Sequence, residues 1–263
     1  MYITIFMFII LLLLLKYYLV LLLNIISYTL ALFLFLNKER YSISKENILM
    51  NRLQSNINIS WVKFNYIILN SNKNFIFNIM MLFLQKYLHL SMINYYDIKS
   101  YYLPKKCQLV MMHFGLFYDL ISGQRIFNKS LVGIYKGKFK NIKTDKIHMM
   151  RHNMINYDKL QKYYIIFTPI DQKSNSNIFV NFLGGKVKFH SNLVNYSLKS
   201  KRDLYMYYVK INPNSFTLNI HKIDTNTEFN DLIQNIATDM TNIIKRDPCQ
   251  YAWLHNRFNI NIK

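Results

Sequence analysis

The sequence has few of the residues that break, bend or cross-link a chain: six Gly, four Pro and two Cys among 263 residues. Cys107 and Cys249 provide neither a disulfide framework nor a metal-type spacing, which indicates a reducing compartment. No Gly-rich loop of the kind that binds nucleotide phosphates is present. The His residues show no metal-like repeat, so we expect no zinc site and no bound cofactor.

Acidic residues are also scarce: 13 Asp and Glu stand against 33 Lys and Arg, for a formal net charge of +20. This excess predicts an anionic partner, such as nucleic acid, an anionic membrane surface or a phosphorylated lipid. Asn, Lys, Ile, Tyr and Phe are abundant, as in AT-rich coding sequences, so part of the Lys excess reflects codon composition. No nucleic-acid-binding motif accompanies the charge, and we expect no nucleic-acid partner.

Apolar residues make up 52% of the chain, and residues 1–36 are almost continuously apolar, with Lys16 as the only charge. A membrane helix needs about 20 such residues, so we expect a single-pass anchor within 1–37, with its span near 17–36. The run is too long for a signal peptide and has no small-residue cleavage site. Basic residues follow it, namely Lys38, Arg40, Lys45 and Arg52. They predict that the body, 38–263, lies on the cytoplasmic or matrix side of a bacterial or mitochondrial inner membrane.

The body reads as one α/β domain with a mixed central sheet flanked by helices. Expected strands cover 108–112, 131–136 and 163–168, and a hairpin pairs 204–211 with 215–222. Expected helices cover part of 41–60, 142–150, 190–199 and a stretch from the Thr225–Glu228 capping box to Pro248. For residues 67–90 the sequence favours amphipathic helices that pack on the core or dip into lipid. A second membrane span is the less favoured alternative.

One short apolar strand ends abruptly at His113, with Gly115 two residues later and Asp119 just beyond. The carboxyl end of a strand is where α/β folds place their chemistry. A carboxylate beside an imidazole holds one tautomer and stabilises the protonated form, which makes the histidine a general base. On these residues alone, a core histidine at the end of a strand is an equal alternative.

Several motifs together resemble the late acyltransferases of lipid A biosynthesis, the lauroyl/myristoyl type within the lysophospholipid acyltransferase group. The resemblance covers most of the chain and is most specific in its closing segment, where Pro, Gln-Tyr, Trp, His and Arg-Phe follow in that order. The residues that carry it are His113-Phe114-Gly115, 131–140 with Arg151, Ile170-Asp171-Gln172, 180–185 and 247–258.

The resemblance implies transfer of a fatty acyl chain from an acyl carrier protein thioester, or acyl-CoA, to a hydroxyl of a lipid A-type glycolipid precursor or a lysolipid. It makes His113 the general base and implies no covalent enzyme intermediate. In the family, four residues separate this histidine from its acid, whereas here Tyr118 holds that position and Asp119 follows it. Three alternatives stay open: a bulge that lets Asp119 act, a Tyr118 hydroxyl that orients the imidazole, or loss of activity.

The resemblance also assigns substrate-binding residues. Arg151 corresponds to a basic residue near the substrate or the oxyanion, or else lies at a solvated helix end. Asp171 and Gln172 either align the site or cap a loop. Lys136 and Lys138 suit a phosphorylated headgroup or an acidic carrier protein, or else form a solvated loop. Trp253, His255 and Arg257 are expected to be structural. The alternative function is a catalytically degenerate structural subunit of a mitochondrial membrane complex.

Overall fold

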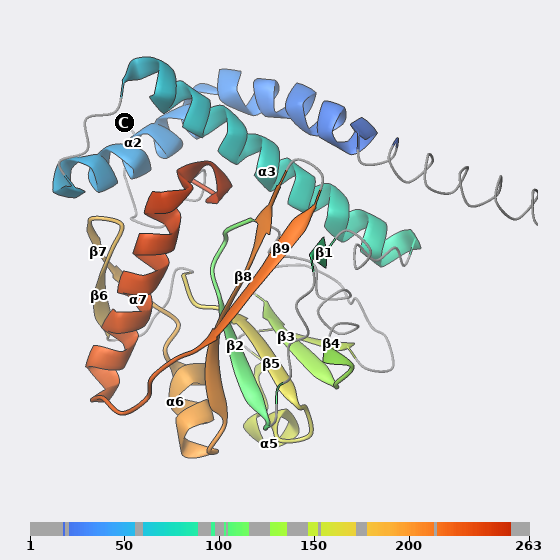
Figure 1. Ribbon diagram of the computed structural model, residues 1–263, viewed down its shortest axis with the longest axis vertical. Helices are drawn as coiled ribbons and strands as arrows, with labels where there is room; N and C mark the ends of the chain where they lie inside the picture. The colour runs from blue at the N-terminus through green and yellow to red at the C-terminus, as the bar shows by residue number, and fades with distance from the viewer. Residues whose placement is uncertain are drawn as a thin grey trace, which may run out of the picture.

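The central feature of the fold is one large sheet capped by helices (Figure 1). The computed structural model describes Tyr18, Leu103 and residues 21–55, 60–88, 96–97, 105–115, 127–135, 147–151, 154–171, 178–212 and 215–253. All structural statements below concern these residues.

The sheet has seven strands in the order β1-β9-β8-β2-β5-β3-β4. The strands are β1 (Tyr96–Asp97), β2 (Cys107–Met111), β3 (Leu131–Tyr135), β4 (Ile147–Arg151), β5 (Ile165–Pro169), β8 (Asp203–Ile211) and β9 (Phe216–Lys222). The five strands from β8 to β4 are parallel, and β9 pairs antiparallel with β8. A separate antiparallel hairpin joins β6 (Phe179–Phe182) to β7 (Gly185–Lys188). The predicted mixed α/β sheet is therefore confirmed.

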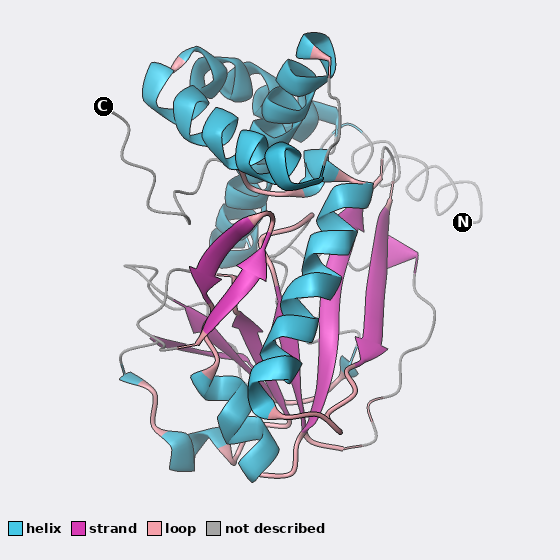
Figure 2. Ribbon diagram, turned by 90° about the vertical axis from the view of Figure 1, so that its left-hand side faces the viewer, coloured by secondary structure: helices cyan, strands magenta, loops and turns pink. Residues whose placement is uncertain are grey.

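Helices cover one face and one end of this sheet (Figures 1 and 2). Helix α7 (Phe229–Arg246) runs along a face with the shorter α6 (Asn192–Lys199), while a helix at Leu21–Leu36, α2 (Lys38–Ser55) and α3 (Trp61–Leu88) stack across the end. Two short elements, α5 (Tyr157–Leu160) and the 3₁₀ turn η3 (Pro248–Gln250), complete the described helices. The end that α3 covers is the carboxyl end of the parallel strands, since Asn78 of α3 donates to the carbonyl of Gly115, four residues past β2.

Strand β2 is buried on both faces, which explains why every residue in it except Gln108 is apolar. Leu109 and Met111 join one hydrophobic cluster, whereas Val110 joins the cluster that includes α7. Strands sandwiched between two layers in parallel sheets read as continuous apolar runs, because neither face meets water. Helix α7 packs into the second cluster through one buried stripe, which consists of Leu232, Ile233, Ile236, Ala237, Met240, Ile243 and Ile244.

Most predicted elements are confirmed, including the β8–β9 hairpin, α6 and the stripe of α7. The helix expected over 142–150 was wrong where the structure describes it, since Ile147–Arg151 forms β4. Strand β4 lies at the edge of the sheet and forms its backbone hydrogen bonds with β3. The residue pattern within 142–150 contains no information about this pairing partner. The capping box was also wrong: Glu228 itself is the N-cap of α7 and its side chain makes no capping bond.

The predicted single span receives no support from the described helices. None of them is long and apolar enough to cross a membrane alone. Leu21–Leu36 and Lys38–Leu49 meet the length and hydropathy requirement together, but the pair is bent by 88°. Residues 1–17, 19 and 20 of the expected anchor lie outside the described part of the chain.

Candidate active site

His113 lies two residues beyond the end of β2, where the chain turns sharply. Phe114 forms an isolated bridge to Tyr251, and Gly115 forms one to Val209 of β8. The amide of Ala252 donates to the carbonyl of His113 at 3.0 Å, which fixes the backbone of the turn. The side chain of His113 is 6% exposed, so its position is set by packing as well as by hydrogen bonds.

Asp171 is the carboxylate partner of His113. Strand β5 is the parallel neighbour of β2, with Pro169 opposite Met111, so the two residues that follow each strand meet at the same edge. His113 Nδ1 lies 2.8 Å from Asp171 Oδ1, and the His113 backbone N–H donates to Oδ2 at 3.0 Å. The hydroxyl of Tyr251 donates to the same Oδ2 at 3.1 Å. The Asp171 side chain is fully buried, and three hydrogen bonds support its charge.

This geometry selects one form of the imidazole. An ionised carboxylate only accepts hydrogen bonds, so Nδ1 of a neutral His113 carries the proton that it donates to Asp171. Nε2 is then the basic nitrogen. When Nε2 takes a proton, the buried carboxylate stabilises the resulting cation. The pair therefore has the arrangement of a general base with its orienting acid.

Helix α3 binds the segment that carries Tyr251. Three polar side chains on one face of this helix, Ser71, Asn74 and Asn78, donate to the carbonyls of Tyr251, Cys249 and Gly115. They are buried, and their spacing of three to four residues is one turn of helix, so they form a single row. Trp253 adds a bond from its indole N–H to the carbonyl of Pro248 at 2.7 Å. The expected structural role of Trp253 fits these contacts.

The other predicted site residues divide into two groups. Arg151 is the last residue of β4 and lies opposite Tyr135 of β3. Its strand is three positions from β2 in the sheet, roughly 14 Å away at the usual strand spacing, so it shares the edge with His113 without touching it. The second group lies outside the described residues: Tyr118, Asp119, Lys136, Lys138, Gln172, His255 and Arg257.

Two features of the site were missed in the sequence. For Asp171 the sequence predicts either alignment of the site or a loop cap, and it does not predict the direct bond to His113. For Tyr251 the sequence indicates only membership of the closing motif, although its hydroxyl donates to Asp171. A usable signal existed, because His113 and Asp171 each stand two residues after an apolar strand. That signal becomes informative only if the two strands are neighbours.

Neither cysteine has the character of a nucleophile. Burial raises the pKa of the Cys107 thiol to about 12 and that of Cys249 to about 11. Both are therefore neutral thiols near pH 7. We expect native protein to react with iodoacetamide at pH 8 at least about a hundredfold more slowly than free cysteine, whereas protein in denaturant reacts at the ordinary rate. Fast alkylation of either residue in the folded protein would contradict this environment.

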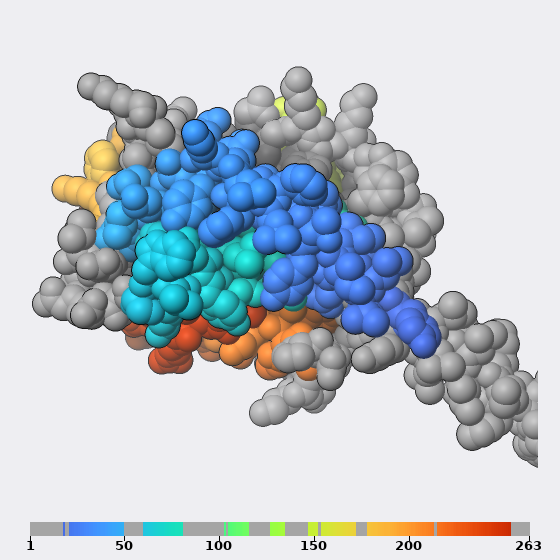
Figure 3. All heavy atoms as spheres, turned by 90° about the horizontal axis from the view of Figure 1, so that it is seen from above, coloured from blue at the N-terminus to red at the C-terminus, as the bar shows by residue number. Residues whose placement is uncertain are grey.

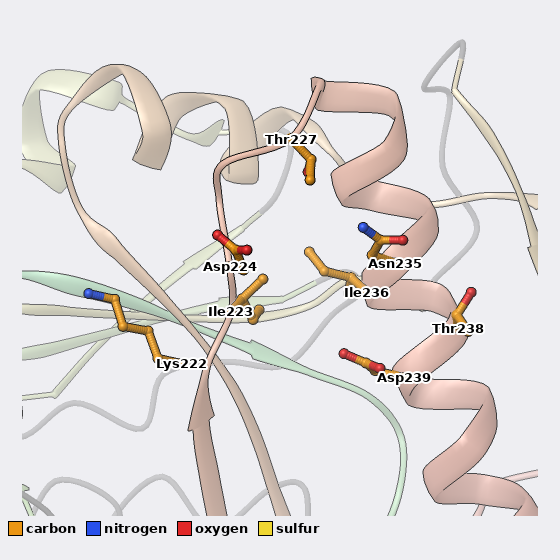
Figure 4. A pocket seen from close by; sticks show the side chains of 8 residues that line it. All are labelled: Lys222, Ile223, Asp224, Thr227, Asn235, Ile236, Thr238 and Asp239. Atoms are coloured by element: carbon orange, nitrogen blue, oxygen red, sulfur yellow. The ribbon is translucent and has the colours of Figure 1, made fainter.

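A pocket of about 310 Å³ lies elsewhere, between the end of β9 and α7 (Figure 4). It is near the amino ends of the parallel strands, because Ile223 in its wall donates to Leu204 at the start of β8. Asp224 and Asp239 contribute carboxylates to its lining, and Lys222 is paired with Asp203 at 3.1 Å. Such a polar, remote pocket does not suit a fatty acyl chain. Among the described residues, no three His, Cys, Asp or Glu side chains gather as metal ligands.

The fold and the pair define a mixed α/β protein with a histidine–carboxylate base at the carboxyl ends of two parallel strands. Residues 145–259 match the family described as bacterial lipid A biosynthesis acyltransferase, which supports the family resemblance over this part of the chain. The matched segment includes Arg151, Asp171 and Tyr251, while His113 precedes it. No curated protein matches the chain.

Proposed function

We propose that this protein transfers a fatty acyl group from a carrier thioester to a hydroxyl of a membrane lipid, with His113 as the general base and Asp171 as its positioning residue. The observation that carries the proposal is the 2.8 Å contact between His113 Nδ1 and Asp171 Oδ1. The match of residues 145–259 to lipid A acyltransferases supports the type of reaction.

The reaction follows from the protonation state of the pair. Nε2 of His113 takes the proton of the acceptor hydroxyl as its oxygen attacks the thioester carbonyl carbon, which gives a tetrahedral oxyanion. This intermediate collapses with cleavage of the carbon–sulfur bond, and the imidazolium returns the proton to the leaving thiolate. An ester and a free thiol result. Asp171 stays ionised throughout and stabilises the imidazolium.

The proposed substrates suit the charge of the chain. An acidic acyl carrier protein or acyl-CoA as donor, and a phosphorylated glycolipid precursor or lysolipid as acceptor, are both anionic, whereas the chain has a formal net charge of +20. Arg151 at the same sheet edge, together with Lys136 and Lys138, is proposed to bind their phosphate groups. We place the protein at a bacterial or mitochondrial inner membrane with its body on the cytoplasmic or matrix side.

The first test replaces the base. His113→Ala in the purified full chain is expected to lower acyl transfer by at least about a thousandfold, since a general base contributes about 10²–10⁴ and the cavity also misplaces the acceptor. The measurement is thiol release from an acyl carrier thioester together with mass spectrometry of the acylated lipid. Circular dichroism verifies that the variant is folded.

The matched control is His221→Ala, because His221 lies exposed on β9, away from the pair. It should keep the wild-type rate. Transfer by His113→Ala at the rate of His221→Ala would refute the proposed base. A wild-type chain that transfers nothing, and that co-purifies in fixed ratio with other membrane proteins, would support the structural-subunit alternative instead.

A further inference from the structure

The Leu21–Leu36 helix has a narrow inner stripe and a broad apolar outer face. Leu23, Ser27 and Ala31 are buried at intervals of four residues, which places them on one side of the helix. The exposed apolar side chains elsewhere on it are Leu21, Leu22, Ile25, Ile26, Tyr28, Leu30, Leu32, Phe33 and Leu36. Contiguous exposed apolar surface of this kind marks an interaction site.

This helix lies along the body of the protein. Ser27 Oγ is 3.5 Å from the sulfur of Met80, and the hydroxyl of Tyr28 donates to Asn70 of α3 at 3.1 Å. The ammonium group of Lys73 lies 4.6 Å from the centre of the Tyr28 ring. These contacts, spread along α3, hold the Leu21–Leu36 helix lengthwise against the protein. The apolar outer face of this helix is therefore exposed along its whole length.

The beginning of α3 extends the same apolar surface. Trp61 is 76% exposed, Val62 71% and Tyr66 59%. Tyr41, just after the Leu21–Leu36 helix, bonds Asn65 in this turn of α3 at 2.9 Å, which brings the two regions together. Residues 21–50 and the first turns of α3 lie side by side on one face of the molecule (Figure 3). We call this the lipid face, comprising Leu21–Leu36 and Trp61–Tyr66.

The charges around the lipid face suit an anionic membrane. Between residues 21 and 80 the sequence has six Lys and Arg against two Asp and Glu. Among them, Lys38, Arg40 and Lys63 are exposed. Basic residues beside an apolar surface attract acidic headgroups, and Trp and Tyr favour the boundary between headgroups and acyl chains. A second protein copy with the same excess positive charge is a poorer match.

The lipid face and the active site segment contact different sides of α3. The polar row of α3 holds the segment that carries Tyr251, and Tyr251 holds Asp171. Asn70 and Met80, on another side of α3, contact the Leu21–Leu36 helix. We propose that the lipid face lies in the plane of an anionic membrane surface, with Trp61 in the interface, so that the pair sits one helix layer above the lipid. This rests on the proposed function only for the identity of the membrane-bound acceptor.

Tryptophan fluorescence tests the proposal directly, because the chain has two Trp residues and Trp253 is only 1% exposed. In vesicles that contain phosphatidylglycerol, brominated acyl chains should quench most of the Trp61 emission. Acrylamide should quench the Trp61 emission in these vesicles at least about tenfold less than it quenches a water-exposed tryptophan in a short peptide without lipid or detergent. The Trp61→Phe variant, which leaves only the buried Trp253, should show no quenching by brominated chains and the same weak acrylamide quenching with and without vesicles. Trp61 that stays accessible to acrylamide and insensitive to bromine in vesicles would overturn the proposal.

Vesicle activity separates this proposal from the proposed function. The double variant Trp61→Ser/Val62→Ser should transfer acyl groups normally to an acceptor in detergent micelles but at least about tenfold more slowly to the same acceptor in vesicles. Met154→Ser, an exposed apolar residue outside the lipid face, is the control and should match wild type in both. Equal vesicle rates for the three proteins would overturn the lipid face even while His113-dependent activity persists. If self-association of the protein without lipid protects Trp61 from acrylamide, the lipid face binds a second copy of the chain. This result would also refute the proposal.

Discussion

Asp171→Asn is expected to lower the turnover number by about a thousandfold while leaving KM for both substrates nearly unchanged. The amide group of Asn can donate to Nδ1 of His113, which would move the imidazole proton to Nε2 and remove the basic nitrogen. If the Asn side chain instead turns its carbonyl oxygen toward Nδ1, the tautomer of His113 is kept. The neutral amide then stabilises the imidazolium less than a carboxylate does. Steady-state kinetics with an acyl carrier thioester and a lipid acceptor measure the effect.

Tyr251→Phe is the graded comparison for this prediction. It keeps the carboxylate and its two bonds to His113 but removes the hydroxyl donor at 3.1 Å. Loss of one such bond costs about 0.5–1.5 kcal/mol, so the rate should fall by only about two- to tenfold. If the turnover number of Asp171→Asn is far lower than that of Tyr251→Phe while both variants keep the thermal stability of the wild type, Asp171 has a positioning role and not a structural one.

Asp119→Asn tests the assignment against the carboxylate that the spacing in the sequence suggested. Under the present assignment, Asp119→Asn retains far more activity than Asp171→Asn. If Asp119→Asn is the inactive variant and Asp171→Asn works normally, Asp171 is not the partner that matters in catalysis. The proposed mechanism would then have to be rebuilt around Asp119.

Gly115→Ala is expected to unfold or severely destabilise the protein, by more than about 3 kcal/mol. A Cβ atom at Gly115 would lie 1.7 Å from the carbonyl oxygen of Val209, which is backbone of β8 and cannot move aside alone. Its φ of 58° adds the strain of a left-handed conformation, about 1–2 kcal/mol for a residue with a side chain. Thermal unfolding should show a midpoint lower by about 10 °C or no cooperative transition.

The local hydrogen bonds explain why the strain cannot relax. The amide of Gly115 donates to the carbonyl of Gln250 at 2.9 Å, and its own carbonyl accepts from Asn78 of α3 at 2.6 Å. Moving the glycine would break both. Gly184→Ala is the control, since Gly184 also has a positive φ, 80°, but occupies the tight turn of the β6–β7 hairpin. A Gly115→Ala protein as stable as Gly184→Ala would show that the turn after β2 does not approach the backbone of Val209 closely.

Local patterns predicted the elements whose hydrogen bonds and burial are themselves local. The stripe of α7 and the β8–β9 hairpin follow from spacing within one segment, and both are confirmed. The pattern failed at β4, where a strand at the sheet edge is defined by its pairing with β3. It also failed at the start of α7, because Thr225 and Glu228 suit a capping box in sequence while the chain begins its helix three residues later.

For the site, the sequence by itself determined that an imidazole ends an apolar strand and that a carboxylate ends another. It also determined the basic charge and the abundance of apolar residues that the lipid face uses. Which carboxylate meets His113 was decided by the order of the strands: β5 inserts between β2 and β3, so residues 58 positions apart become neighbours. Strand order depends on the packing of the whole sheet against its helices, and no spacing within a single segment encodes it.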